Sequence, residues 1–141
     1  MDSFEAVARL ASARVARLAT VRPDGRAHVV PLVFALVEQE DGVVAYWVVD
    51  EKPKSGRVLQ RIKNLEANPL AELLVDGYEE EWSRLWWVRA SVRGREVLDP
   101  EERNRALEAL VGKYPQYRNA RPGGRIFALE VKAIDAWSAE G

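Results

Sequence analysis

The fold is decided by the stretch Ala19-Thr-Val-Arg-Pro-Asp-Gly-Arg-Ala-His-Val-Val-Pro-Leu-Val-Phe34. Small and β-branched residues lie on both sides of a Pro-Asp-Gly segment, which is typical of two strands joined by a turn. Pro23 sets φ for the turn, and Gly25 accepts a positive φ. We therefore predict a β-hairpin here, with a second strand over residues 27–37.

Further strands and helices are predicted outward from this hairpin. Strand patterns cover residues 15–21, 43–49, 71–75, 85–98, 126–131 and 134–137, and helices are expected from Asp2 or Ser3, over residues 55–67 and from Asp99. Asp99 should cap its helix because Pro100 follows it and Glu102 lies three residues on. Gly94 predicts a bulge or kink in its long strand. Strands joined mostly by short turns, without βαβ alternation, indicate a mainly β chain with flanking helices (α+β), folded as a small antiparallel barrel.

Length and composition favour one domain over residues 1–141. Hydrophobic residues make up 48% of the chain, enough for a real core, and the formal net charge is −1. The balanced charge argues against general nucleic-acid binding, which requires a basic excess. No apolar run approaches the ~20 residues that span a bilayer. Asp2, Glu5 and Arg9 interrupt any signal-peptide pattern, so we expect a soluble cytoplasmic protein with no membrane contact.

Residue counts exclude several kinds of catalytic site. The chain has no cysteine and one histidine, His28. Thiolate nucleophiles, disulfides, thiolate zinc sites and two-histidine metal motifs are therefore impossible, and we predict no metal site. His28 lies within a strand pattern without an evident acid partner, so a structural or surface role is favoured over that of a general base. No catalytic residue is predicted.

Basic residues are concentrated at the second predicted helix. Lys54, Arg57 and Arg61 share one helix face beside the apolar stripe, and Lys52 lies just before them. Ser55 adds a hydroxyl near the helix N-terminus, where the dipole and free N–H groups favour anions. Two interpretations follow: a solvated basic face, or an anion site in which the stems lie on the core and the charged heads reach a ligand.

Tryptophans are concentrated in Trp82-Ser-Arg-Leu-Trp-Trp-Val-Arg89. Trp86 and Trp87 must point to opposite faces of a strand. One of them can fill the barrel while the other, beside Arg84 or Arg89, faces a partner subunit or an aromatic ligand. Packing as core and lid is the alternative.

The order and spacing of these features resemble the pyridoxamine-phosphate-oxidase-like split barrels, which bind flavins or the deazaflavin coenzyme F420. The hairpin and the basic helix ending in Asn68-Pro69 carry the resemblance. The tryptophan-rich segment, Lys113-Tyr-Pro-Gln-Tyr-Arg118 and Trp137-Ser-Ala further resemble an F420-dependent subgroup. The resemblance covers nearly the whole chain and implies an antiparallel split β-barrel of the FMN-binding type. It also implies a homodimer with the cofactor at the subunit interface.

The resemblance places a cofactor on particular residues. In the family, a cation eight residues before the proline of the Asn-Pro ending holds the cofactor phosphate, and Arg61 stands at that position. The ring of the cofactor lies along two strands, whose matching positions here are Val30, Pro31, Leu32, Val33, Tyr46 and Trp47. Trp86 completes the candidate set. Pro31 has no N–H, so it must lie at a sheet edge or where the ladder opens.

We therefore expect an F420-dependent oxidoreductase that transfers a hydride between the deazaflavin and a small conjugated or quinone-like acceptor. The cofactor would carry the chemistry, which matches the lack of an acid–base constellation. The acidic oligoglutamate tail of F420 could engage Lys52, Lys54 and Arg57. The alternatives are an FMN-dependent oxidoreductase or oxidase of the same fold and a non-catalytic F420 or flavin carrier. Haem binding is disfavoured because His28 and Met1 are the sole residues of their types.

Overall fold

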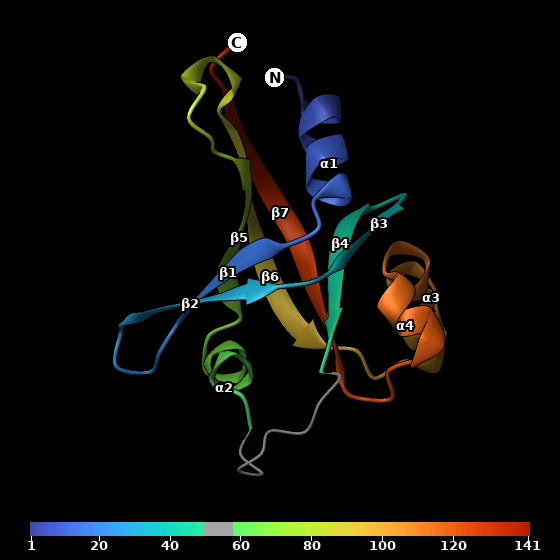
Figure 1. Ribbon diagram of the computed structural model, residues 1–141. Coiled ribbons are helices and arrows are strands. Elements are labelled where there is room, and N and C mark those ends of the chain that lie inside the picture. Colours follow the sequence, from blue (N-terminus) through green and yellow to red (C-terminus); the bar gives the residue numbers. More distant parts are fainter. Residues whose placement is uncertain (50–57) are drawn as a thin grey trace.

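A seven-stranded antiparallel sheet organises the protein in the computed structural model, which describes residues 1–49 and 58–141 (Figure 1). The strands lie in the order β2-β1-β5-β6-β7-β4-β3. Their bounds are β1 (Ala16–Val21), β2 (Ala27–Leu32), β3 (Ala35–Gln39), β4 (Gly42–Val48), β5 (Leu70–Gly77), β6 (Trp86–Glu96) and β7 (Ile126–Ser138). The helices are α1 (Ser3–Ser12), α2 (Gln60–Ala67), α3 (Pro100–Lys113) and α4 (Pro115–Asn119), with a short 3-10 helix η1 (Trp82–Arg84).

The connection between β2 and β3 makes the sheet curl into a barrel. These two strands form opposite edges of the sheet, yet only Val33 and Phe34 separate them in the chain. The Tyr114 hydroxyl accepts a hydrogen bond from the Phe34 N–H at 3.1 Å and lies 2.9 Å from the carbonyl oxygens of Phe34 and Arg14. The prediction of one strand over residues 27–37 is therefore wrong, because the chain leaves one edge and joins the other at residues 33–34. The predicted fold, mainly β with flanking helices, is confirmed.

Two clusters of buried side chains lie on opposite faces of this curved sheet. The first fills the barrel and includes Leu18, Trp47, Leu73, Phe127 and Leu129, together with Ala6 and Leu10 of α1 and Ile62 and Leu65 of α2. The second lies where α3 and α4 cover β3, β4 and the start of β7, and includes Tyr46, Leu107, Leu110, Tyr117 and Ile126. Figure 1 shows these two helices beside β3 and β4, while α2 lies near the far end of β1. Successive residues of β4 thus serve different clusters, as the period of a strand requires.

Turn and cap predictions agree with the structure. Gly25 has φ of +90°, and its N–H bonds the carbonyl of Arg22 at 2.8 Å within the β1–β2 hairpin. The Asp2 carboxylate accepts the N–H of Glu5 at 2.8 Å and caps α1. The Asp99 carboxylate accepts the N–H of Glu102 at 3.0 Å and caps α3. These local signals were readable because each uses residues within one turn.

Other boundaries differ from the predictions. The helix expected from residue 55 begins at Gln60, because residues 58 and 59 are already non-helical. Gly94 causes no bulge; the register shift lies between Ser91 and Val92, opposite Lys132, and the two terminal strand segments form one strand. Helix α4 was not predicted.

No helix among the described residues is both long and apolar enough to cross a membrane.

Candidate functional site

Arg61 lies in the first turn of α2, at one end of the barrel. Its guanidinium carbon is 4.9 Å from the centre of the Trp47 ring. Trp47 is buried and stacks on Phe127, with ring centres 4.7 Å apart and an angle of 16° between planes. The stacked rings therefore fix the position of a half-buried cation beside the core, as expected for a residue at the border of the apolar stripe.

Buried hydrogen bonds hold α2 against β1. The Asn64 amide donates to the Thr20 hydroxyl at 2.9 Å, and the Gln60 amide donates to the Asn64 carbonyl at 2.8 Å. Thr20 and Asn64 are the two buried polar residues of the described core. A buried polar group without a hydrogen-bond partner costs free energy of folding. The Asn64–Thr20 hydrogen bond therefore favours one position of α2 on β1, and this position also sets where Arg61 lies.

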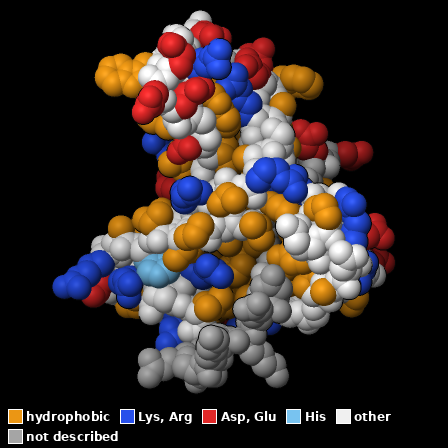
Figure 2. Space-filling view, viewed as in Figure 1, with side chains coloured by type: hydrophobic (Ala, Val, Ile, Leu, Met, Phe, Trp, Pro, Cys, Tyr) orange, Lys and Arg blue, Asp and Glu red, His pale blue; other side chains and the backbone are white. Residues whose placement is uncertain are grey.

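His28 lies opposite Thr20 in the β1–β2 register, near the same end of the barrel. Burial lowers the pKa of His28, and the charges of Arg22 and Arg61 lower it further. The imidazole is therefore neutral at pH 7 and faces a positive potential. Figure 2 shows Lys and Arg side chains gathered around the hairpin region. Sequence reasoning missed Arg22; its position beside the predicted hairpin turn was the available signal.

Two buried nitrogens at this end of the barrel have no hydrogen-bond partner among the described residues. They are His28 Nδ1 and Trp47 Nε1. Buried polar atoms are normally satisfied, so such atoms often mark a place for a ligand or water. Together with the positive charge of Arg22 and Arg61, they fit an anionic group rich in oxygen acceptors, such as a phosphate-bearing cofactor.

The predicted ring-binding positions on β2 and at Val33, just after it, alternate between buried and exposed side chains. Leu32 is buried and Val30 partly buried against the barrel cluster, whereas Pro31 and Val33 are exposed. Because β2 is an edge strand, the missing N–H of Pro31 is tolerated, as predicted. The strand thus presents both apolar side chains and free edge backbone groups near α2.

Tyr46 points away from this end of the barrel. Its hydroxyl donates to Glu102 at 2.6 Å, and Glu102 accepts two hydrogen bonds from Arg95 at 2.8 and 2.7 Å. Burial, together with the hydrogen bond to Glu102, raises the pKa of Tyr46 to about 12. The structure does not bring the Tyr46 side chain together with Trp47; only the Tyr46 backbone is left for contacts there.

Trp86 lies at the opposite end of the sheet. Across the sheet, Trp47 is level with Phe127 of β7, which is level with Glu96 at the last position of β6. Trp86 is the first residue of β6 and therefore lies a full strand length away. At the rise of a strand this separation is on the order of 30 Å, so Trp86 and Arg61 of one protomer do not share a small site. Trp87 points to the other face, and the guanidinium carbon of Arg89 lies 5.0 Å from its ring centre. That this tryptophan faces a partner subunit or an aromatic ligand stays a prediction.

The remaining predicted site residues, Lys52, Lys54, Ser55 and Arg57, lie outside the described residues. Their role stays a prediction. Within residues 1–49 and 58–141, no group of three His, Asp or Glu side chains is placed to hold a metal ion.

Comparisons with known proteins agree with this fold. The sequence matches the family described as "Pyridoxamine 5'-phosphate oxidase" over residues 4–138. No curated protein matches significantly.

Solved structures share the fold at low identity. A conserved hypothetical protein from Mycobacterium tuberculosis has a TM-score of 0.75 at 19% identity, covering 99% of this chain and 86% of that one. A FAD-binding protein from Mesorhizobium loti has a TM-score of 0.70 at 21% identity, covering 96% and 92%. A haem storage protein from Vibrio cholerae has a TM-score of 0.71 at 15% identity, covering 99% and 98%. At such identities the similarity concerns the fold, and the described ligands are those of the other proteins.

Proposed function

The protein belongs to the pyridoxamine 5'-phosphate oxidase family, and we propose on that basis that it is an oxidoreductase dependent on coenzyme F420. When bound, this deazaflavin would supply hydride transfer to or from a small conjugated or quinone-like acceptor. The observation that carries the proposal is the placement of Arg61 over Trp47, beside Arg22 and the neutral His28.

Different groups around Arg61 would bind different parts of the cofactor. The Arg61 guanidinium can donate two parallel hydrogen bonds to phosphate oxygens, which a lysine could not do. Trp47 supports the guanidinium from the core side, so little side-chain entropy is lost on binding. The β2 edge from Val30 to Val33 supplies backbone groups and apolar side chains for a flat ring. The barrel packing excludes water from that side.

The basic run before α2 supports F420 over FMN. Lys52, Lys54 and Arg57 add cations beyond those that a single phosphate needs. An acidic tail on the cofactor would use them. The resemblance of the tryptophan-rich segment to F420-dependent relatives supports the same choice.

Two other functions have specific support. The similarity to a FAD-binding protein from Mesorhizobium loti favours a flavin, so FMN is the second candidate cofactor. A protein from Vibrio cholerae that shares this fold is described as a haem storage protein, which supports a non-catalytic carrier of F420 or flavin as the third candidate.

Calorimetric titration of the apo-protein with F420 and with FMN tests the proposal. We expect tighter binding of F420, with a steeper loss of affinity as salt is raised, because more charges are neutralised. Lys54→Ala and Arg57→Ala should narrow the difference in salt dependence. FMN binding tighter than F420 binding would select the flavin alternative. Tight F420 binding without turnover of any quinone-like acceptor would select the carrier.

A further inference from the structure

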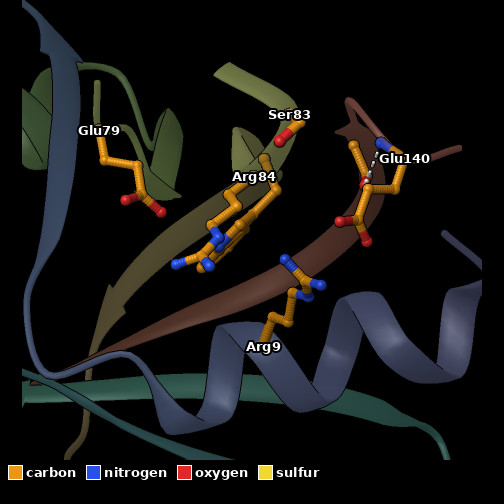
Figure 3. Close-up of a pocket in the computed structure, with 7 residues that line it drawn as sticks. Arg9, Glu79, Ser83, Arg84 and Glu140 are labelled. Carbon is orange, nitrogen blue, oxygen red and sulfur yellow. Dashed lines mark hydrogen bonds between the residues drawn. The ribbon is translucent and has the colours of Figure 1, made fainter. Parts of the chain in front are cut away.

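A pocket lies at the end of the barrel opposite α2. It has a volume of about 450 Å³, within the usual range for small-molecule sites. Its walls come from α1, from the connection between β5 and β6, and from the end of β7 (Figure 3). The lining residues are Arg9, Glu79, Ser83, Arg84, Trp86, Ser138 and Glu140.

The walls of this pocket are anchored to one another. The guanidinium of Arg9 lies 4.6 Å from the ring centre of Trp86 and is held by Glu5 at 3.0 Å. Trp86 pairs with Gly77 across the strands, and its indole occupies the space that a Cβ at Gly77 would need. The Ala139 N–H bonds the Leu85 carbonyl at 2.9 Å, which ties the end of β7 to the connection. A pocket with such walls is preformed, which lowers the entropic cost of binding a ligand.

The charges in the pocket do not neutralise one another. Figure 3 shows the side chains of Arg9 and Arg84 directed toward the middle, with Glu79 and Glu140 on opposite sides. Among the described residues, Arg84, Glu79 and Glu140 take part in no ion pair, although all three line one cavity. Two guanidinium groups that face the same space favour a carboxylate between them. Two carboxylates at the rim favour a cationic group on the same ligand.

We propose that this pocket binds a free α-amino acid with an apolar side chain. Its carboxylate would accept hydrogen bonds from Arg84 and Arg9, its ammonium would donate to Glu79 or Glu140, and its side chain would lie against Trp86. A ligand with only negative charge would meet two carboxylates, and one with only positive charge would meet two arginines. The zwitterion satisfies both sets of groups. Within one protomer this site is separate from the proposed cofactor site, which lies at the far end of the sheet.

The probe for this proposal is L-phenylalanine, titrated into the full chain by calorimetry. Phenylalanine amide, which lacks the carboxylate, and N-acetylphenylalanine, which lacks the ammonium, are the matched ligands. We expect the free amino acid to bind and each blocked form to bind about tenfold or more weakly, because each loses a charge-assisted hydrogen bond. Equal binding of all three, or no binding of phenylalanine at millimolar concentration, would overturn the proposal.

Substitutions locate the site. Arg84 and Glu79 are exposed, so Arg84→Ala and Glu79→Gln should leave the thermal unfolding midpoint and F420 affinity unchanged. Arg84→Ala should weaken phenylalanine binding about tenfold. The double substitution Glu79→Gln with Glu140→Gln should do the same, because it removes both carboxylates that could accept from the ammonium. Arg93→Ala removes an exposed arginine elsewhere on β6 and should leave phenylalanine affinity unchanged. Unaltered affinity in Arg84→Ala, or an equal loss in Arg93→Ala, would contradict the assignment. Titration of the same variants with F420 measures cofactor binding, so a failure of the proposed function can be told apart from a failure of the phenylalanine site.

Discussion

Arg61 and His28 lie at the same end of the barrel and differ in what they can contribute. Arg61 keeps its charge at any accessible pH and rests on an aromatic ring. His28 is neutral at pH 7 because burial and two arginines lower its pKa. The cation can therefore attract an anion, while the imidazole can share a hydrogen bond without adding charge.

Arg61→Ala should weaken cofactor binding by about 1.5–3 kcal/mol, the range for hydrogen bonds to a charged group. Calorimetric titration with F420 measures this loss. Lys63→Ala is the matched control, since Lys63 is an exposed cation of the same helix. An equal loss in both variants would show that net charge, and not the position of Arg61, sets the affinity.

His28→Ala should retain most of the oxidation of reduced F420 by a quinone-like acceptor. Loss of a positioned general acid or base typically costs about 10²–10⁴-fold in rate. Among the residues that the structure describes, the charged neighbours that shift the pKa of His28 are Arg22 and Arg61, and neither is a carboxylate that could orient it for such a role. A rate loss of that size at saturating F420, with unchanged F420 affinity, would identify His28 as catalytic.

At the scale of elements, a hydrogen-bonded ion network joins β4, β6, β7 and α3. Tyr46 donates to Glu102, and Arg95 bonds both Glu102 and Glu130. The hydrogen bonds from Arg95 are the main cause of the lowered pKa of Glu102, and that from Tyr46 contributes. The network fixes the start of α3 against the outer face of the sheet.

Glu102 should make stability depend on pH. Its pKa in the folded state is below the ordinary value of 4.5, so its contribution is present above that value and is lost as the pH falls through the folded pKa. Glu102→Gln should lower the free energy of unfolding at pH 7 by about 1–2 kcal/mol, a range reduced because Arg95 is partly exposed. Urea unfolding between pH 7 and pH 3 should show a weaker pH dependence in this variant. Glu101→Gln, one residue away and exposed, is the control and should keep the wild-type pH dependence of the free energy of unfolding. A wild-type pH dependence in Glu102→Gln would contradict the assignment.

Gly94 allows α2 to approach β6. A Cβ at Gly94 would lie 2.9 Å from Cδ2 of Leu65, closer than real contacts allow. Gly94→Ala should therefore destabilise the protein by about 1–3 kcal/mol through overpacking. Gly112→Ala, within α3 and with open space around it, should stabilise by about 0.5–1 kcal/mol. Thermal unfolding of the two variants should thus give shifts of opposite sign.

The sequence predicted which segments form helices and strands better than it predicted where a strand is broken. The Asp99 cap and the Gly25 turn depend on neighbouring residues, so the sequence was enough to identify them. The break at Val33 and Phe34 depends on Tyr114, which lies far along the chain. The same reason applies to the candidate site. The family resemblance and the helix pattern point to Arg61, whereas the separation of Trp86 from Arg61 follows from strand pairing that no local pattern contains.

At the scale of the whole molecule, aromatic side chains lie on the outer face of the sheet. Trp87 and Trp137 are cross-strand partners. Tyr78 and Trp87 line one shallow surface pocket together. Tyr78 is 61% exposed and Trp137 42% exposed. We call Tyr78, Trp87 and Trp137 the aromatic face. Exposed aromatic residues of this kind are enriched in protein interfaces.

The protein should therefore be a homodimer at micromolar concentration, with the aromatic face in the interface. Trp137→Arg should shift sedimentation toward the monomer, because an unpaired charge in a desolvated interface is costly. Trp82→Arg changes a tryptophan that is more exposed but lies in η1, outside the sheet, and should leave the dimer intact. A monomer that still binds cofactor would contradict the shared-site arrangement.

The two-residue link between the sheet edges also bears on how fast the chain folds. The hairpins β1–β2 and β3–β4 form from neighbouring residues, but closure needs Leu18 to pair with Leu73 and Ala45 with Leu129. Those pairings close long loops, and topologies dominated by such distant contacts fold in milliseconds to seconds. Tyr114, which lies between α3 and α4 and follows most of the strands, holds the link by hydrogen bonds. The curled sheet should therefore be completed late in folding, after both hairpins have formed.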